Sequence, residues 1–407
     1  MIFVFFNPFT ENAEMTEKLY YQDAHLFQFT AAVLSCSPEK DGFAVELDRT
    51  AFYPEGGGQP SDEGFLIPAG GQPVRVSFVK ERDGVIIHSC DSPLTPGQTV
   101  RGQVDAERRL DLMQQHSGEH IASGLICRHF GCDNVGFHIS DPFVTIDYNV
   151  PISWEALLEI EDEANRVVRD NRPVHIFWPS AEELKALEYR SKKELTGDVR
   201  IVEYPDADVC ACCGTHVSFT GEVGLIKFIS VQSHRGGVRI EMLSGKRALS
   251  YMRQIQAENH AVSVALSARE TQTAAAVLRL QKEALALHER LATLEEESTH
   301  AKAARLSGKG NVLLVEKGLS VDSARRLAAA VMETCGGFCG VLSDCGEDGI
   351  RYVLGQEGGD LRELTKALNS TFSGRGGGKP FFVQGTLHGN VQEAAAFLQK
   401  NTGAQPV

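Results

Sequence analysis

Short apolar runs that alternate with turn residues fill residues 15–105. The runs include FQFTAAVLSC, GFAVELDRT, VRVSFVK, GVIIHSC and QTVRGQVD, and Gly, Pro and Asp separate them. Runs of this length and punctuation are typical of short antiparallel strands. We therefore expect residues 15–105 to form a small β-barrel or sandwich, and residues 1–14, ahead of Met15, to be a disordered extension.

From residue 106 the spacing of apolar side chains becomes helical. Apolar residues between Leu110 and Leu125 recur at intervals of three and four, and a second helix is expected after Ser153, a good N-cap followed by acidic residues. The runs VRIVEY and VGLIKFISVQS favour strands. This pattern predicts an α+β domain over residues 106–249.

Residues 250–306 contain neither Gly nor Pro and are rich in Ala, Leu, Glu and Gln. As one continuous helix this stretch would extend about 80 Å at 1.5 Å per residue. Two interpretations remain open, namely a coiled-coil linker that forms an arm or a homodimer seam, and a helix packed on its own domain. The apolar seam consists of Val277, Leu280, Ala284, Leu287, Leu291 and Leu294.

The remaining residues, 307–407, alternate strand-like and helix-like runs, which predicts a small α/β domain. Within it, SGRGGGKPFFVQG is expected to be a glycine-rich loop with Arg375 and Lys379 at its edges. The Gly-Lys-Ser/Thr ending of a Walker loop is missing. The fold class is thus multi-domain α+β: a barrel, an α+β domain, a helical linker and a small α/β domain.

Composition excludes several classes of protein. Apolar residues make up 42% and charged residues 23% of the 407, as in ordinary globular proteins. No apolar run is long enough to span a membrane, and MIFVFFNPF lacks the basic start and cleavage site of a signal peptide. Ten cysteines are too dilute for a disulfide scaffold. We expect a cytoplasmic protein with reduced thiols.

The net charge of −14 argues against a bulk electrostatic grip on nucleic acid. Any such contact must come from local basic patches, for which an ordinary solvated surface is the alternative interpretation. In the tail, glycines beside Arg375 and Lys379 would let a phosphate approach backbone amides. The other basic candidates are Arg190, Lys192, Lys193, Arg235, Arg239, Lys246 and Arg247.

Two residue pairs have the spacing of metal ligands. His116 and His120 in QQHSGEHIASGL lie four apart on a predicted helix, where Cβ atoms are about 5–6 Å apart. Cys212 and His216 in VCACCGTHV show the same spacing, with Cys210 and Cys213 as competing ligands. Together the pairs offer the number and type of ligands that Zn²⁺ takes, which predicts one zinc per chain. Buried thiols and chance histidines are the alternative.

A glycine-rich turn interrupts the β region at DRTAFYPEGGGQPSDEG, residues 48–64. Successive glycines permit positive φ and a close approach of backbone to ligand, although a plain flexible turn is the alternative. The glycines are Gly56, Gly57 and Gly58, and the hydrogen-bonding side chains around them are Thr50, Glu55, Gln59 and Asp62.

Four motifs in this order resemble one family. Thr-x-Phe-Tyr-Pro-x-Gly-Gly-Gly-Gln-Pro, His-x3-His, Cys-x-Gly-Thr-His and GGVRIEMLSG are similar to the editing region of alanyl-tRNA synthetase, which freestanding AlaX proteins share. The resemblance covers residues 16–250, and the tail resembles the DHH-associated domain of long-form AlaX. Nothing resembles an aminoacylation core with an ATP site. One departure is Cys213, where the family pattern has glycine.

The resemblance implies a zinc-dependent trans-editing hydrolase that deacylates Ser-tRNA(Ala) and Gly-tRNA(Ala). Rejecting serine by packing alone is limited to about 10–200-fold, so a second site is needed. Thr50 would read the serine hydroxyl, while Gln59 and the glycine loop would hold the ester or the terminal adenosine. A non-catalytic tRNA-binding protein with a structural zinc is the main alternative. A zinc peptidase is weaker, because Glu119 falls at the wrong position for the His-Glu-x-x-His pattern.

Overall fold

The computed structural model describes residues 15–191 and 198–407. The extension expected over residues 1–14 and the candidates Lys192 and Lys193 lie outside the described residues. Contacts divide the chain into two compact units, the first ending at His260 and the second running from Ala261 to Val407. The finer boundaries expected near residues 105 and 249 stay predictions.

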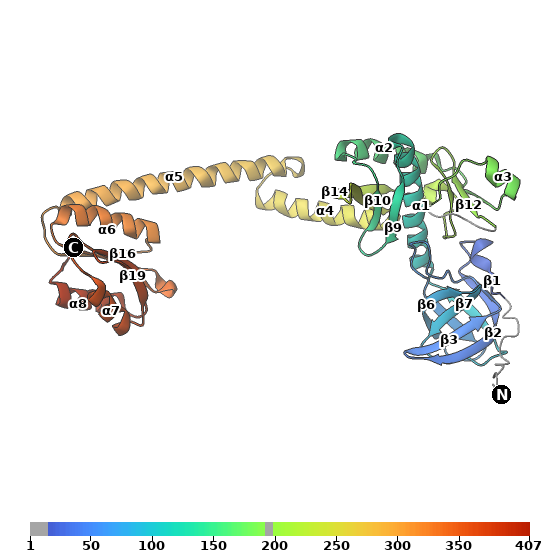
Figure 1. Ribbon diagram of the computed structural model, residues 1–407, viewed down its shortest axis with the longest axis horizontal. Coiled ribbons are helices and arrows are strands. Elements are labelled where there is room, and N and C mark those ends of the chain that lie inside the picture. Colours follow the sequence, from blue (N-terminus) through green and yellow to red (C-terminus); the bar gives the residue numbers. More distant parts are fainter. Residues whose placement is uncertain (1–14, 192–197) are drawn as a thin grey trace, which may run out of the picture. The chain divides into compact units, whose positions relative to one another are not determined.

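The first unit contains a closed barrel of six antiparallel strands, which confirms the barrel among the two expected β architectures (Figure 1). Closure leaves no unpaired strand edge. Alternate side chains of each strand point inward, so Val74 and Val76 are buried on one strand, and a register shift between Val76 and Phe78 makes Val79 the next buried residue. In barrel order the strands are β2 (Gln28–Glu39), β3 (Gly42–Leu47), β7 (Val85–Cys90), β6 (Val74–Arg82), β5 (Gly64–Pro68) and β8 (Thr99–Val104).

Short elements extend this part of the chain. Strand β1 (Glu17–Lys18) pairs in parallel with β4 (Arg49–Thr50), and a 3-10 turn, η1 (Leu19–Tyr21), follows β1 directly. The β1–β4 pairing places residues 17–21 next to the start of the glycine-rich turn, residues 48–64.

Helix α1 (Ala106–Phe130) is the element on which the site is built. The Asp105 carboxylate caps it by accepting the N–H groups of Glu107 and Arg108, and Gly131 ends it with a φ of 58°. Four strands contact it, namely β9 (Asn134–Ile139), β10 (Val144–Tyr148), β13 (Asp208–Ala211) and β15 (Gly237–Ser244). The residues of α1 from Leu112 to Ile126 are almost all buried. Its buried polar side chains therefore need partners within the protein.

A buried ion pair links the barrel to α1. The Arg109 guanidinium, which is fully buried, pairs with Asp62 and also donates to the Ala24 and Ala51 carbonyls. Asp62 in turn accepts the N–H of Tyr53 at 2.6 Å. Removing one partner would leave a buried charge uncompensated, so this network fixes the glycine-rich turn against α1.

Two small antiparallel sheets complete the first unit. One has the order β14 (Ile226–His234), β15 (Gly237–Ser244), β10 (Val144–Tyr148) and β9 (Asn134–Ile139); the other has β11 (His175–Phe177), β12 (Ile201–Tyr204) and β13 (Asp208–Ala211). Around them lie α2 (Trp154–Asp170), α3 (Ala181–Ala186) and η2 (Thr220–Val223). The predicted cap of α2 is confirmed, because the Ser153 hydroxyl accepts the Ala156 N–H at 3.2 Å.

The helix expected over residues 250–306 is interrupted. Helix α4 (Gly245–Ala265) ends, and α5 (Thr273–Leu306) begins after η3 (Glu270–Gln272). The cause is a C-terminal cap in which Ser267 takes a φ of 48°, a position usually held by glycine, while the Ala268 N–H donates to the Ser263 carbonyl. The prediction of one continuous helix about 80 Å long was therefore wrong. Helix α5 has 34 residues, which gives a length of about 50 Å.

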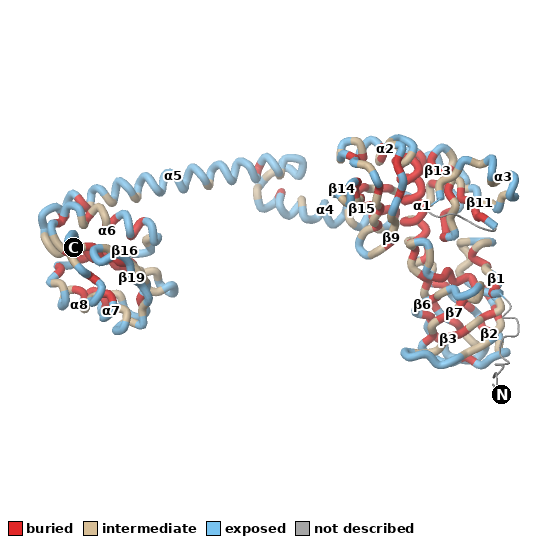
Figure 2. Tube along the Cα trace, in the orientation of Figure 1, coloured by how far each residue is buried: buried red, intermediate tan, exposed pale blue. Residues whose placement is uncertain are grey.

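The apolar seam of α5 is largely uncovered. Leu280, Leu287, Leu291 and Leu294 are all more than half exposed, and Figure 2 shows α5 mostly in the colour of exposed residues. A homodimer seam stays a prediction.

The second unit holds a six-stranded mixed sheet, and strands and helices alternate along this part of the chain, as expected. The order is β19 (Arg375–Lys379), β20 (Phe382–Leu387), β18 (Ile350–Gln356), β17 (Phe338–Asp344), β16 (Val312–Lys317) and β21 (Gln405–Pro406). Besides η3 and α5, the described helices of this unit are α6 (Val321–Cys335), η4 (Gly346–Asp348), α7 (Arg362–Thr371) and α8 (Val391–Thr402).

The glycine-rich segment of this unit is not the expected loop. It forms strand β19, which pairs with β20 at the edge of the sheet. Glycine permits this pairing, since a Cβ on Gly376 would lie 2.2 Å from the Tyr352 hydroxyl and 2.4 Å from the Gln384 carbonyl oxygen. All ten cysteines are free thiols. Among the described residues, none of the helices combines the length and apolar character needed to cross a bilayer.

Candidate metal centre

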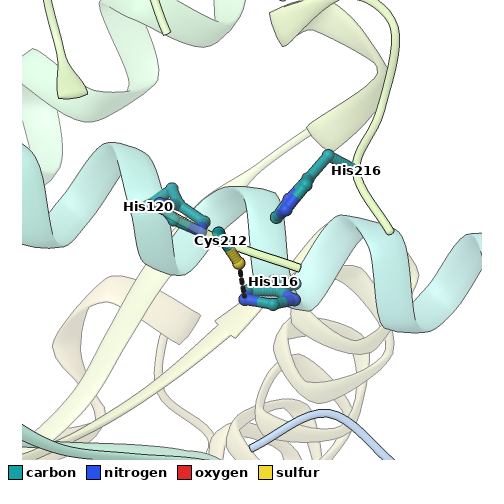
Figure 3. A group of neighbouring side chains, drawn as sticks. All are labelled: His116, His120, Cys212 and His216. Carbon is teal, nitrogen blue, oxygen red and sulfur yellow. Dashed lines mark hydrogen bonds between the residues drawn. The ribbon is translucent and has the colours of Figure 1, made fainter. Parts of the chain in front are cut away.

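The structure brings the two expected ligand pairs together. His116 and His120 extend from successive turns of α1, and Cys212 and His216 come from the segment that follows β13 (Figure 3). One ligand atom from each side chain lies within 4.8 Å of all the others. The histidines are buried and Cys212 is half-buried.

Each histidine is held in place through its Nδ1 atom. Nδ1 of His116 lies 2.8 Å from Gln59 Oε1, Nδ1 of His120 lies 2.8 Å from Asp208 Oδ2, and Nδ1 of His216 lies 3.1 Å from the Tyr204 hydroxyl. With the proton on Nδ1, the lone pair of each ring is on Nε2. Partners of this kind fix the tautomer and orientation of metal-binding histidines.

The Nε2 atoms lack ordinary partners. Those of His120 and His216 are buried and accept no hydrogen bond from any described residue, and that of His116 lies 3.5 Å from Cys212 Sγ. A buried polar atom left unsatisfied costs about 1–3 kcal/mol. These two unsatisfied nitrogens, together with His116 Nε2 and Cys212 Sγ, fit a tetrahedral Zn²⁺ in both ligand type and number.

The sulfur of Cys212 is suited to the same task. Burial raises the pKa of its thiol, but the nearby His116 and His216 outweigh burial, and the pKa lies well below its ordinary value. The Gly214 N–H also donates to this sulfur at 3.4 Å. The thiolate is the form that binds metal.

An overlapping group of His120, Asp208 and Cys210 is a poorer candidate. The Asp208 carboxylate already accepts from His120 and takes two hydrogen bonds from Arg190, each 2.7 Å long. Burial raises the pKa of Asp208, but Arg190 and His120 outweigh burial and the pKa is lowered. Asp208 therefore acts as the orienting partner of His120, which favours the four-residue set.

The glycine-rich turn lies against this centre. Gly56 and Gln59 exchange backbone hydrogen bonds, and Gly57 and Gly58 have φ values of 60° and 86°. A Cβ on Gly58 would lie 2.7 Å from the ring and carbonyl oxygen of Phe137, whose ring stacks on His116 at 5.0 Å. Only glycine permits this approach.

A cavity of about 520 Å³ opens beside this group, and three of its members, His116, His120 and Cys212, line it. Gly57 and Gly58 line one part of it, and the Cys-rich segment lines another. Glu119 also lines it, but its carboxylate accepts from the Ser123 hydroxyl at 2.7 Å and the Asn134 amide at 2.6 Å. Glu119 thus belongs to a buried polar network.

Gln59 has a different position from the one expected for an ester-binding residue. It is fully buried, its Oε1 accepts from His116 and from the Thr215 N–H, and its Nε2 donates to the Thr215 hydroxyl at 2.8 Å. Both ends of the amide are therefore engaged with protein, and the contacts favour a role in orienting His116.

Thr50 is also fully buried, and it does not line the cavity. Its hydroxyl lies 2.9 Å from His88 Nε2 and accepts the Phe52 N–H at 3.1 Å. The other ring nitrogen of His88 donates to the Val45 carbonyl, so Thr50 must donate to His88. These contacts favour the alternative that Thr50 is structural, and its reading of a serine hydroxyl stays a prediction.

The basic candidates of the first unit are mostly paired with acids. Arg190 binds Asp208, Arg239 binds Asp147 through two hydrogen bonds of 2.7 Å, and Arg247 binds Asp111. Lys246 pairs with Glu107 but is exposed. Arg235 is exposed in the turn between β14 and β15.

In the second unit, Arg375 and Lys379 are exposed on β19. Within the described part of the chain, neither forms an ion pair. Arg375 and Lys379 thus resemble Arg235, which is also exposed and forms no ion pair with a described residue.

Sequence reasoning missed the residues that orient the histidines. Asp208 and Tyr204 lie on β13 and β12, just before Cys212, and neither belongs to a recognisable motif. Metal-binding histidines commonly donate their second ring nitrogen to a carboxylate. Asp208 would have been found if the strands beside the Cys-rich segment had been searched for such a carboxylate.

Comparison with known proteins places two family matches on the first unit. The family "tRNA synthetases class II (A)" matches residues 6–108, and the family "Threonyl and Alanyl tRNA synthetase second additional domain" matches residues 199–241. Part of the chain therefore shares sequence with a class II synthetase family, and the six barrel strands lie within that part. The expectation that the chain has no aminoacylation core with an ATP site stays a prediction.

Individual relatives extend the similarity. An alanine–tRNA ligase of Halorubrum lacusprofundi is 32% identical over 390 residues, which are 91% of this chain and 42% of that protein. The alanyl-tRNA editing protein AlaX-L of Pyrococcus horikoshii is 35% identical over 248 residues, 59% of this chain and 61% of that protein. The chain therefore spans less than two thirds of the length of these curated relatives.

Proposed function

We propose that this chain, which is similar to alanine–tRNA ligases and to an AlaX-L editing protein, is an aminoacyl-tRNA deacylase that hydrolyses the ester of mischarged Ser-tRNA(Ala) and Gly-tRNA(Ala). The single observation that carries the proposal is the group His116, His120, Cys212 and His216 beside a cavity lined by the glycine-rich turn. Action on tRNA would place the protein in the cytoplasm.

Within this proposal, the four side chains hold one zinc ion. A zinc bound there would anchor the substrate or polarise an ester carbonyl. Four protein ligands close a tetrahedral shell, so Cys212, the half-buried member beside the cavity, is the ligand that a substrate can reach most readily.

The surrounding residues give the cavity its shape and polarity. Gly57 and Gly58 bring backbone close to the space beside His116, where amide groups can meet a developing oxyanion. The orientation of the three imidazoles is fixed by hydrogen bonds at the histidine Nδ1 atoms, whose partners are Gln59, Asp208 and Tyr204. Hydrolysis then needs a water in the cavity and the ester carbonyl turned toward the loop.

The tRNA would contact exposed basic residues on both units. The candidates on the first unit are Arg235, Lys246 and Arg239, which is half-buried, and those on the second are Arg375 and Lys379. Because each contact is a phosphate contact, binding should weaken steeply with salt. The α5 seam is proposed to pair with a second copy of the chain.

The test is hydrolysis of charged tRNA by the purified protein. Release of serine and glycine, but not of alanine, from tRNA(Ala) is expected. Cys212→Ser should abolish release and remove the roughly one zinc per chain. Cys345→Ser is the matched control, because Cys345 is also half-buried but lies in the second unit.

Two outcomes would count against the proposal. Tight tRNA binding with zinc but no ester loss would support the non-catalytic alternative. If a variant that lacks all four residues still contains one zinc per chain, these residues are not the zinc ligands.

A further inference from the structure

A cationic and aromatic cluster lies next to the metal-binding segment. The Arg200 guanidinium carbon is 5.1 Å from the centre of the Tyr21 ring and 5.9 Å from that of Trp178. The two rings are 6.2 Å apart and nearly perpendicular, at 72°. The three residues come from the start of the barrel region, the end of β11 and the start of β12, so only the tertiary fold assembles them.

Arg200 ties the cluster to the candidate ligands. Its NH1 donates to the Cys212 carbonyl at 2.7 Å and to the Gly214 carbonyl at 3.1 Å. Arg200 is only 5% exposed, yet its Nε has no hydrogen-bond partner among the described residues. A buried guanidinium nitrogen without a partner marks a place where a further acceptor would be stabilising.

A run of aromatic rings leads from the cluster to the glycine-rich turn. Tyr21 packs edge-on against Tyr20 at 4.6 Å, and Tyr20 against Tyr53 at 5.5 Å. The Tyr53 hydroxyl then donates to the Gly56 carbonyl at 3.2 Å. The cluster is thereby joined to both walls of the cavity, the cysteine-rich segment and the turn.

Trp178 itself is 50% exposed, although it is the largest side chain in the cluster. A tryptophan that served only to cover Arg200 would gain from burial, since apolar area in water is unfavourable. Half of its surface instead remains free for a flat ligand, beside a guanidinium and with Lys18 5.8 Å from the Tyr21 ring centre.

We propose that Trp178, Tyr21 and Arg200 form a stacking platform for an unpaired base at the single-stranded 3′ end of the tRNA. Single-stranded nucleic acid is recognised by bases stacked on aromatic rings and by cations near the backbone. The proposal rests on the deacylase function above: a base held on the platform places the terminal ester at the adjacent cavity.

The first experiment measures binding without catalysis. The chain has two tryptophans, so Trp154→Phe leaves Trp178 as the only one. Titration with the trinucleotide CCA should quench its emission saturably, and added salt should weaken the quenching. Unchanged emission at all concentrations would overturn the platform. This result does not depend on hydrolysis, so it separates failure of the platform from failure of the deacylase proposal.

The second experiment uses Ser-tRNA(Ala) hydrolysis. Stacking on an aromatic side chain implies that Trp178→Ala raises KM about 5- to 150-fold with little change in kcat. Trp178→Phe should restore most of the loss. Phe65→Ala is the control, because Phe65 is a 42% exposed aromatic on the barrel. An unchanged KM in an active Trp178→Ala protein would refute stacking, and so would a loss of bound zinc, which would mean that Trp178 only supports the metal segment.

Discussion

Gly214→Ala tests whether the position of His116 is what makes the centre bind metal. A Cβ at residue 214 would lie 2.3 Å from Cε1 and 2.4 Å from Nδ1 of His116, and 3.1 Å from Gln59 Oε1. Non-bonded carbon atoms settle at about 3.5–4.0 Å, so the imidazole would have to retreat by about 1 Å. The substitution adds one methyl group and changes no ligand.

The size of this displacement decides the expected effect. A zinc–nitrogen bond is about 2.0–2.1 Å long and tolerates about 0.2 Å of error, so a retreat of about 1 Å breaks it. The hydrogen bond from His116 to Gln59, now 2.8 Å, would be lost as well. Loss of such an orienting partner alone lowers metal affinity about 10–100-fold, or about 1.4–2.7 kcal/mol. We expect at least this loss.

The assay is competition for zinc with a chromogenic chelator at fixed pH, alongside thermal unfolding. Gly56→Ala is the matched control, because its Cβ would meet only the Tyr53 hydroxyl at 3.6 Å and the Pro54 carbonyl oxygen at 4.0 Å. Wild-type zinc affinity in a folded Gly214→Ala protein would refute the reasoning. An equal loss in Gly56→Ala would show that the effect is not specific to His116.

Four further outcomes follow from the structure. Burial lowers the pKa of His88 to about 4 from 6.5, so the unfolded chain binds the extra proton first and stability falls as the pH drops from about 6.5 to about 4. Urea midpoints should show this fall in the wild type and a smaller fall in His88→Gln, in which only the contribution of this histidine is removed. Because the Thr50 hydroxyl is already bonded within the barrel, Thr50→Val should slow serine and glycine release alike; a loss confined to serine would restore its direct role. Cutting the chain after His260 should raise KM for charged tRNA more than it lowers kcat, since uniform binding is lost; an unchanged KM would contradict a role of the second unit in binding. Light scattering should show a dimer that Leu287→Glu and Leu291→Glu dissociate, and a wild-type monomer would exclude the seam.

The sequence by itself determined the parts of the site whose geometry is local. The spacing of His116 and His120 on one helix, and of Cys212 and His216 after a strand, already defined the candidate ligand set, because a separation of four residues fixes relative side-chain position within one element. Alternating apolar runs likewise predicted the barrel strands, since burial on one face imposes a period of two.

Tertiary structure decided what no local period encodes. The break at Ser267 depends on a cap that needs neither Gly nor Pro, and the strand at Arg375–Lys379 depends on pairing with β20. The burial of Gln59 and Thr50 could not be predicted for the same reason. A polar side chain near a motif can face a ligand or the interior, and the local sequence is the same in both cases. Their burial was settled by packing against α1 and across the barrel, where every buried polar atom must find a partner in space, whatever its distance along the chain.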